Sequence, residues 1–159
     1  MEQEQLSKAF NATVQASLHG LQSLEPILRR EQTALVSRDP EVLTDIVQEK
    51  IALLKQLEPS MQARNRLQVS AGMPEGIEGG SRLVEMLNQD PLTRDWGQLT
   101  RLAKTVSELN DHNGSLALQG QRVAREALGI LTGRSPSDDT YTTQRRKNGG
   151  TASYSFGKA

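Results

Sequence analysis

Residues 99–131 read LTRLAKTVSELNDHNGSLALQGQRVAREALGIL and contain two rows of residues that each repeat every seven positions. The first row consists of Leu102, Leu109, Leu116, Val123 and Ile130. The second row consists of Leu99, Val106, Asn113, Gly120 and Ala127. Two such rows are typical of a helix that packs against other helices as in a coiled coil. We therefore predict one long helix from about residue 92 to residue 132, with Gly133 as its C-cap.

The first half of the chain predicts a pair of helices. Apolar residues recur at helical spacing over residues 2–37 and again over residues 40–69. Between them, Asp39 suits an N-cap, Pro40 suits the first helical position, and Glu41 complements the helix dipole. So short a connection makes the two helices antiparallel neighbours, which form a hairpin over residues 2–70.

Two prolines lie inside this predicted hairpin. Pro26 and Pro59 each remove a backbone donor, so each is expected to kink its helix. Counting outward from the turn places Pro59 opposite residue 20, close to Gly20, so both arms are expected to bend at one level. The alternative is that one arm breaks into two helices there.

The remaining segments are punctuated by glycine. Residues 70–81, SAGMPEGIEGGS, predict a loop, after which Ser81 caps a short helix over residues 82–88. Residues 134–159 are polar and glycine-rich without periodicity, which predicts a flexible tail. We therefore predict one helical domain over residues 1–133, with the hairpin at 2–70, the loop at 70–81 and helices over 82–132.

Composition agrees with an all-α protein built as an elongated, coiled-coil-like bundle. Only 35% of the 159 residues are hydrophobic, which suits long helices packed along a narrow row better than a thick core. The absence of cysteine excludes disulfides and thiol chemistry. The first residues lack the features of a secretory signal, and no run is apolar enough to span a membrane. We expect a soluble, cytoplasmic protein, and the zero net charge without a broad basic face argues against nucleic acid as a partner.

Catalytic and metal-binding constellations are missing from the sequence. Glu108, Asp111 and His112 lie close together on a helix, but a di-metal carboxylate bundle needs paired Glu-x-x-His motifs that do not occur. The glycine-rich stretch over residues 76–81 lacks the lysine and the spacing of a nucleotide-binding loop. Residues 145–147, RRK, are too few charges for a membrane anchor and fit a solvated tail. We predict no enzymatic activity, no metal and no cofactor.

The helix face between residues 113 and 131 is the candidate binding surface. A polar amide in an apolar row fixes register and partner choice, and glycine allows close approach of another backbone. Further small and apolar residues make this face wider than one neighbouring helix covers. The predicted partner-binding residues are Asn113, Leu116, Gly120, Val123, Ala124, Leu128 and Leu131, together with Tyr141 from the tail. The alternative is a helix buried between two partners of its own bundle.

Three stretches resemble the FlgN-type flagellar export chaperones. They are the acidic turn at Asp39–Glu41 followed by a lysine-containing helix, the Leu-Asn-x-x-Asn-Gly element at residues 109–114, and Tyr141 followed by Gly149. The resemblance implies a small cytoplasmic helical chaperone without enzymatic activity. Such a chaperone would bind hook-associated (hook–filament junction) proteins by their C-terminal segments, prevent their premature association and deliver them to the export apparatus. The other hypothesis is a structural coiled-coil protein that self-assembles through the same face.

Overall fold

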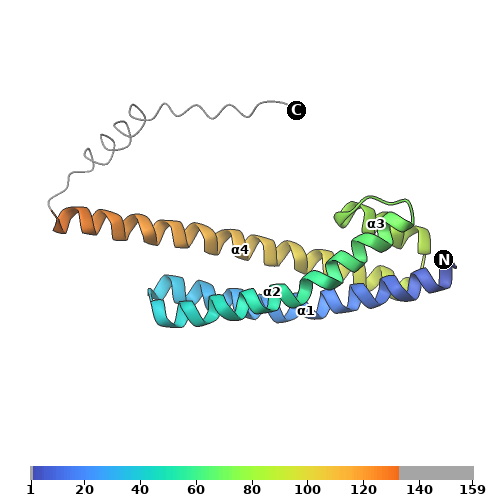
Figure 1. The fold of residues 1–159 in the computed structure, drawn as a ribbon, viewed down its shortest axis with the longest axis horizontal. Helices are drawn as coiled ribbons and strands as arrows, with labels where there is room; N and C mark the ends of the chain where they lie inside the picture. Colours follow the sequence, from blue (N-terminus) through green and yellow to red (C-terminus); the bar gives the residue numbers. More distant parts are fainter. Residues whose placement is uncertain (1, 133–159) are drawn as a thin grey trace, which may run out of the picture. The chain divides into compact units, whose positions relative to one another are not determined.

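The computed structural model describes residues 2–132, and within that range it contains four helices and no strand. They are α1 (Gln3–Ser37), α2 (Pro40–Ser70), α3 (Gly76–Leu87) and α4 (Asp90–Leu131) (Figure 1). The all-α prediction is confirmed. The chain divides into two compact units, Met1–Ala117 and Leu118–Ala159, which are described separately below. The predicted C-cap Gly133 and the predicted tail lie outside the described residues.

The predicted hairpin is present, with α1 and α2 antiparallel and side by side (Figure 1). Arg38 ends α1 with a left-handed backbone conformation, φ 55°. The carboxylate of Asp39 accepts a hydrogen bond from the backbone N–H of Val42 at 3.2 Å, and Pro40 is the first residue of α2. A local cap and a proline at the first helical position therefore set the turn, as predicted.

Both prolines lie inside helices that continue past them. Pro26 is within α1 and Pro59 is within α2, so the alternative in which one arm breaks into two helices is wrong. Gly20 packs directly against the side chain of Leu57, and a β-carbon at Gly20 would overlap it. The prediction that Gly20 lies at the level of Pro59 is thus confirmed, and glycine at residue 20 allows α1 and α2 to approach closely.

The predicted loop over residues 70–81 is wrong at its end, because α3 begins at Gly76. Gly79 and Gly80 lie inside this helix, where Gly79 packs on the carbonyl of Pro74 and Gly80 packs on the indole of Trp96. A β-carbon at either position would overlap those atoms. These glycines provide space for close packing, whereas the sequence pattern indicated only chain flexibility.

The helix start predicted at Ser81 is wrong as well. Ser81 lies within α3, where its hydroxyl donates to the carbonyl of Ile77 at 3.0 Å and accepts from Trp96 Nε1 at 3.0 Å. The start of α3 is held instead by the end of α2. There the buried Gln68 donates to the carbonyls of Pro74 and Gly76, at 2.8 and 3.0 Å.

The main hydrophobic core of the first unit joins α1, α3 and the first turns of α4. It consists of Leu6, Phe10, Val14, Leu18, Leu83, Val84, Leu87, Leu92, Trp96 and Leu99. The rings of Phe10 and Trp96 lie 5.9 Å apart, and the guanidinium of Arg64 lies 5.6 Å from the centre of the Trp96 ring. Burial lowers the pKa of Arg64, because the charged form loses hydration. Stacking on the indole compensates part of that loss.

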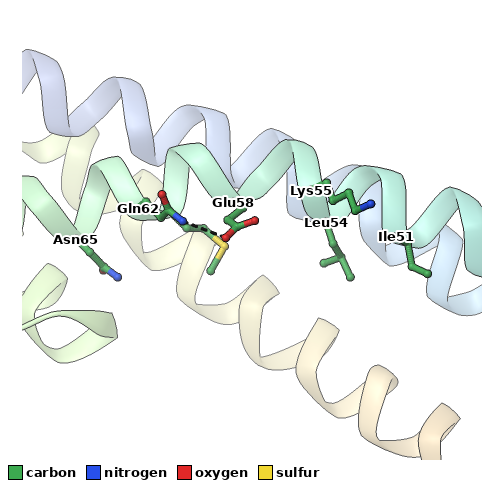
Figure 2. A pocket seen from close by; sticks show the side chains of 7 residues that line it. Ile51, Leu54, Lys55, Glu58, Gln62 and Asn65 are labelled. Atoms are coloured by element: carbon green, nitrogen blue, oxygen red, sulfur yellow. Dashed lines mark hydrogen bonds between the residues drawn. The ribbon is translucent and has the colours of Figure 1, made fainter.

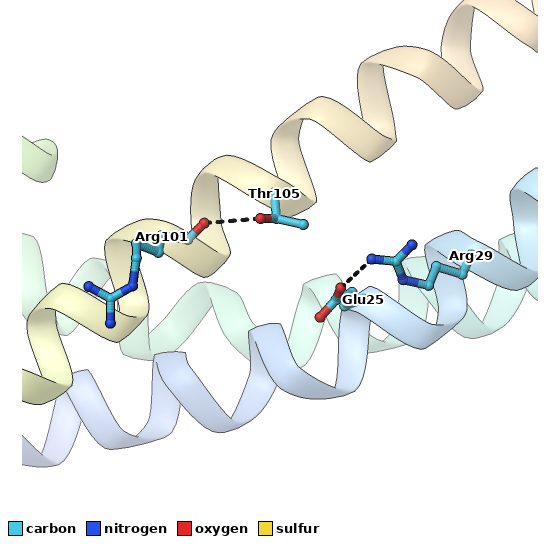
Figure 3. Close-up of polar contacts among 4 residues, drawn as sticks. All are labelled: Glu25, Arg29, Arg101 and Thr105. Atoms are coloured by element: carbon cyan, nitrogen blue, oxygen red, sulfur yellow. Dashed lines mark hydrogen bonds and ion pairs between the residues drawn. The ribbon is translucent and has the colours of Figure 1, made fainter.

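Two smaller clusters continue the core toward the hairpin turn. Leu24, Leu28 and Val106 join α1 to α4, and Ile27, Ala34 and Ile46 join α1 to α2. Many surface polar contacts stay within one helix. Figure 3 shows two of them, the Arg29–Glu25 ion pair of α1 at 2.7 Å and the hydrogen bond from Thr105 to the carbonyl of Arg101 in α4. Such pairs contribute only about 0.2–0.5 kcal/mol each, so apolar packing holds the helices together.

Candidate partner-binding surface

The second seven-residue row of α4 forms its buried side in the first unit. Leu99, Val106 and Asn113 are buried, whereas Leu102 and Leu109 of the first row are half-buried. Leu116 and Ala117 are also half-buried, and they are the last residues of α4 in this unit. In the sequence the first row continues to Ile130 and the second row continues to Ala127. Burial ends much earlier than the apolar pattern does.

Asn113 is almost fully buried, with 2% of its surface exposed. Its amide nitrogen donates to the carbonyl of Leu28 at 2.8 Å and to Glu31 Oε1 at 2.9 Å. The prediction that Asn113 contacts an outside partner is therefore corrected, because the side chain is enclosed and its donors are used within the bundle. Its part in fixing helix register stays a prediction, and the two bonds place that part between α4 and α1.

Glu31 and Lys50 form a buried ion pair that the sequence analysis missed. Lys50 Nζ lies 2.6 Å from Glu31 Oε2, and the side chains are 19% and 5% exposed, respectively. With Asn113, this pair links α1, α2 and α4 at one level. Counting outward from the turn at Asp39 places Lys50 roughly opposite Glu31, and Glu31 interrupts the apolar stripe of α1. These two signals together could have predicted the pair.

A cavity of about 230 Å³ opens beside this polar link. Its apolar walls come from Leu35 of α1, Leu43 and Val47 of α2, and Ala117 of α4. Gly114 also lines it, and a β-carbon there would meet no atom within 4 Å. The first unit therefore has an apolar recess at the level where the burial of α4 ends.

The part of α4 in the second unit exposes most of its apolar side chains. Leu128 is 61% exposed and Leu131 is 83% exposed. Leu118, Val123 and Ile130 are also exposed, and so are Gly120 and Ala124. Gly120, Ala124, Leu128 and Leu131 are spaced by four, four and three residues, so they lie on one helix face.

The predicted binding residues thus fall into three groups. Asn113 is internal, and Leu116 is half-buried next to it. Gly120, Val123, Ala124, Leu128 and Leu131 form an exposed stretch, which we call the α4 apolar face. Tyr141 lies outside the described residues. Gly120 follows Asn113 in the second row and Val123 belongs to the first row, whereas Ala124, Leu128 and Leu131 lie in neither row.

The geometry of the described residues 2–132 meets the requirements of neither a metal site nor a membrane-spanning helix. No group of three His, Asp or Glu side chains is placed there to hold a metal ion. Glu108, Asp111 and His112 are exposed side chains of α4 and form no such group in the described part of the chain. None of the four helices is long and apolar enough to cross a membrane.

Comparison with known proteins shows the family to which the chain belongs. The chain matches the family described as FlgN protein over residues 1–149, which include the hairpin, α3 and all of α4. The chain belongs to the FlgN family. A relative from Proteus mirabilis named "Flagella synthesis protein FlgN" is 31% identical over 128 residues, covering 79% of this chain and 82% of the relative. No solved structure matches the chain. The resemblance predicted from the sequence is confirmed, and FlgN membership gives the chain a role in flagellum assembly.

Proposed function

We propose that this FlgN-family protein is a cytoplasmic type III export chaperone. It binds hook-associated proteins by their C-terminal segments, prevents their premature association and delivers them to the flagellar export apparatus. The observation that carries the proposal is the α4 apolar face, whose large side chains Val123, Leu128 and Leu131 are exposed. Family membership supplies the flagellar context.

The chemistry of the α4 apolar face suits an amphipathic helix as ligand. Soluble proteins rarely expose a continuous apolar strip unless it binds something. A subunit destined for export carries an apolar helical segment that would associate early, and a helix can bind such a segment along its own apolar side. Full burial of Leu128 and Leu131 would contribute about 1.5–3 kcal/mol each. Those two side chains are the proposed anchors.

Residues around the anchors have supporting parts in this proposal. Gly120 has open space around its α-carbon and admits the backbone of a bound helix. Val123 and Ala124 widen the contact, and Leu116 is proposed to take part in binding as well. Tyr141 is proposed to contact the bound segment or the export apparatus. The protein acts by binding, without catalysis and without a cofactor.

The first test replaces both anchors. Leu128→Asp combined with Leu131→Asp introduces two carboxylates into the contact, and binding to a purified hook-associated protein should weaken at least about a hundredfold in calorimetry. Because both side chains are exposed, the free energy of unfolding should change by no more than about 0.5 kcal/mol.

The matched control is Val36→Asp combined with Val42→Asp. Both valines are exposed apolar side chains beside the hairpin turn, far along the chain from the α4 apolar face. This control should bind the hook-associated protein as the wild type does. If wild-type protein binds no hook-associated protein, the proposal is wrong. If the anchor variant unfolds, the two leucines belong to the core and the assigned surface is wrong.

A second candidate is a structural protein that self-assembles through the same face. The continuation of both seven-residue rows over the exposed end of α4 favours it. Light scattering of the isolated protein separates the candidates, since a scaffold forms larger assemblies as concentration rises, and the anchor variant should abolish them. A chaperone shows no such growth.

A further inference from the structure

Arg64 of α2 is a buried charge without an opposite charge. It is 6% exposed, and its guanidinium lies 5.6 Å from the centre of the Trp96 ring. None of the ion pairs found among residues 2–132 includes Arg64, and its Nε is closed to solvent without a hydrogen-bond partner there. A buried charge in this state is costly to the folded protein, and stacking on the indole compensates only part of that cost.

The bundle compensates another enclosed charge of the same helix. Lys50 Nζ lies 2.6 Å from Glu31 Oε2, so this charge is paired within the first unit. Gln68, one turn after Arg64, has a buried Oε1 without a partner, yet no hydrogen bond joins it to Arg64. A methionine at residue 64 would fill similar space without an unpaired charge. Arg64 therefore lowers the stability of the free protein, and residues with that effect are expected at functional sites.

The surface next to Arg64 is apolar. Met61 lies three residues before Arg64, so the two are neighbours on the helix, and Met61 is 47% exposed. Ile51, Leu54 and Met61 supply the apolar part of a shallow groove of about 450 Å³. The residues that line it extend along α2 from Ile51 to Asn65, which follows Arg64 directly in the chain (Figure 2). A segment bound in this groove therefore comes close to Arg64.

The charges at this surface specify the chemistry of a partner. Lys55 lines the groove and belongs to none of the ion pairs found among residues 2–132. Glu58 lines it too and accepts a hydrogen bond from Gln62 at 3.0 Å. With Arg64, this surface carries two positive charges and one negative charge. A complementary segment has apolar side chains and an acidic group.

We propose that Arg64 binds a carboxylate of the hook-associated protein, carried by an amphipathic helical segment that lies along this groove. The inference rests on the proposed function. Arginine binds a carboxylate through two parallel hydrogen bonds, and arginine is enriched among the residues that dominate binding interfaces. The acid supplies the opposite charge that Arg64 lacks in the free protein. One such pair adds to the anchors Leu128 and Leu131 and does not hold the hook-associated protein by itself.

Arg64→Met tests this role in two measurements on the full chain. In calorimetry, binding to a purified hook-associated protein should weaken at least about tenfold, because the acid of the bound segment loses its partner. The midpoint of thermal unfolding of the free protein should rise or stay unchanged, because methionine removes an uncompensated buried charge. An arginine that only supports the fold gives the reverse result, a lower midpoint with unchanged binding.

Arg66→Met is the matched control. Arg66 is an exposed arginine of α2, two residues after Arg64, and it belongs to none of the ion pairs found among residues 2–132. The control removes the same charge from the same helix. It should leave both the affinity for the hook-associated protein and the unfolding midpoint close to those of the wild type.

Substitutions in the hook-associated protein identify the acid. Single aspartate-to-asparagine and glutamate-to-glutamine changes are made along its C-terminal segment. One of them should weaken binding to the wild type about as much as Arg64→Met does, and should have no further effect on the Arg64→Met variant.

The outcomes separate this inference from the proposed function. If the wild type binds and Arg64→Met binds equally well, the inference is wrong and the proposed function stands. A lowered unfolding midpoint in Arg64→Met, or the lack of any acid coupled to Arg64, also overturns the inference alone. A wild type that binds no hook-associated protein overturns both.

Discussion

At the scale of single residues, Asn113 connects the sequence motif to the stability of the first unit. Its amide bonds the carbonyl of Leu28 and the carboxylate of Glu31, both on α1. Asn113→Ala removes both bonds and should lower the free energy of unfolding by about 1–3 kcal/mol in urea titrations. Asn113→Asp should cost more, because it places a second carboxylate against Glu31. Asn110→Ala, an exposed amide three residues earlier, is the control and should have little effect.

The Glu31–Lys50 pair gives a second prediction at this scale. Lys50→Met leaves a buried carboxylate without its opposite charge and should destabilise the protein by about 3–5 kcal/mol. The double variant Glu31→Met/Lys50→Met removes both charges and should recover most of that loss in the same thermal or urea titration. A single variant as stable as the wild type would show that the ion pair makes no contribution.

At the scale of helices, glycine has opposite effects in α3 and α4. Gly79 packs on the backbone carbonyl of Pro74, which cannot move aside easily, so Gly79→Ala should destabilise the first unit by about 1–3 kcal/mol. Gly114 and Gly120 have open space, so alanine at either position should stabilise α4 by about 0.5–1 kcal/mol. Thermal unfolding followed by circular dichroism compares the three variants directly.

The same pair of α4 glycines tests the binding surface. Only Gly120 lies on the proposed α4 apolar face, so Gly120→Ala should weaken binding of a hook-associated protein, and Gly114→Ala should leave it unchanged. If both variants bind equally well, the bound helix does not approach the backbone at Gly120 closely. The proposed anchors Leu128 and Leu131 would not be affected by that result.

These helices also show how far the sequence predicts the structure. Asp39 and Pro40 act through local capping, so the hairpin turn follows from neighbouring residues alone. The start of α3 does not follow from neighbouring residues. Gly79 packs against Pro74 of the preceding loop and Gly80 packs against Trp96 of α4, so both glycines are required by tertiary contacts. Glycine signals flexibility in a pattern, whereas here it provides space. The helix start predicted at Ser81 was wrong for the same reason.

The sequence predicts which residues of α4 share a row, but the register between α1 and α4 decides which of them are buried. Ser7 bonds Gln89, which immediately precedes α4, and Gln15 and Glu31 bond Asp95 and Asn113 within α4. Residues of α1 therefore meet residues that lie 80–82 positions later in the chain. At a spacing of 82, Leu35 in the last turn of α1 corresponds to Ala117, the last residue of the first unit. Both rows keep the same seven-residue spacing before and after this point. Sequence alone therefore places Asn113 and Gly120 in one row without showing that one is buried and the other exposed.

At the scale of the whole molecule, stability and binding are expected to separate along the chain. The three hydrophobic clusters and the Glu31–Lys50–Asn113 link all lie within Met1–Ala117. The exposed anchors Leu128 and Leu131 lie after it. A chain that ends at residue 117 should therefore keep the midpoint and cooperativity of urea unfolding of the full chain, while losing measurable binding to a hook-associated protein in calorimetry.

This truncation differs from the anchor substitutions because it also removes residues 118–127 and the segment after residue 132. If the shortened chain unfolds at a much lower urea concentration, the removed residues stabilise the first unit. The α4 apolar face would then be covered in solution and not exposed. If it folds and still binds, the recess beside Leu35, Leu43 and Val47 becomes the principal binding surface. Retained stability with lost binding supports the division into a bundle that folds by itself and a helix end whose apolar face is covered only by a partner.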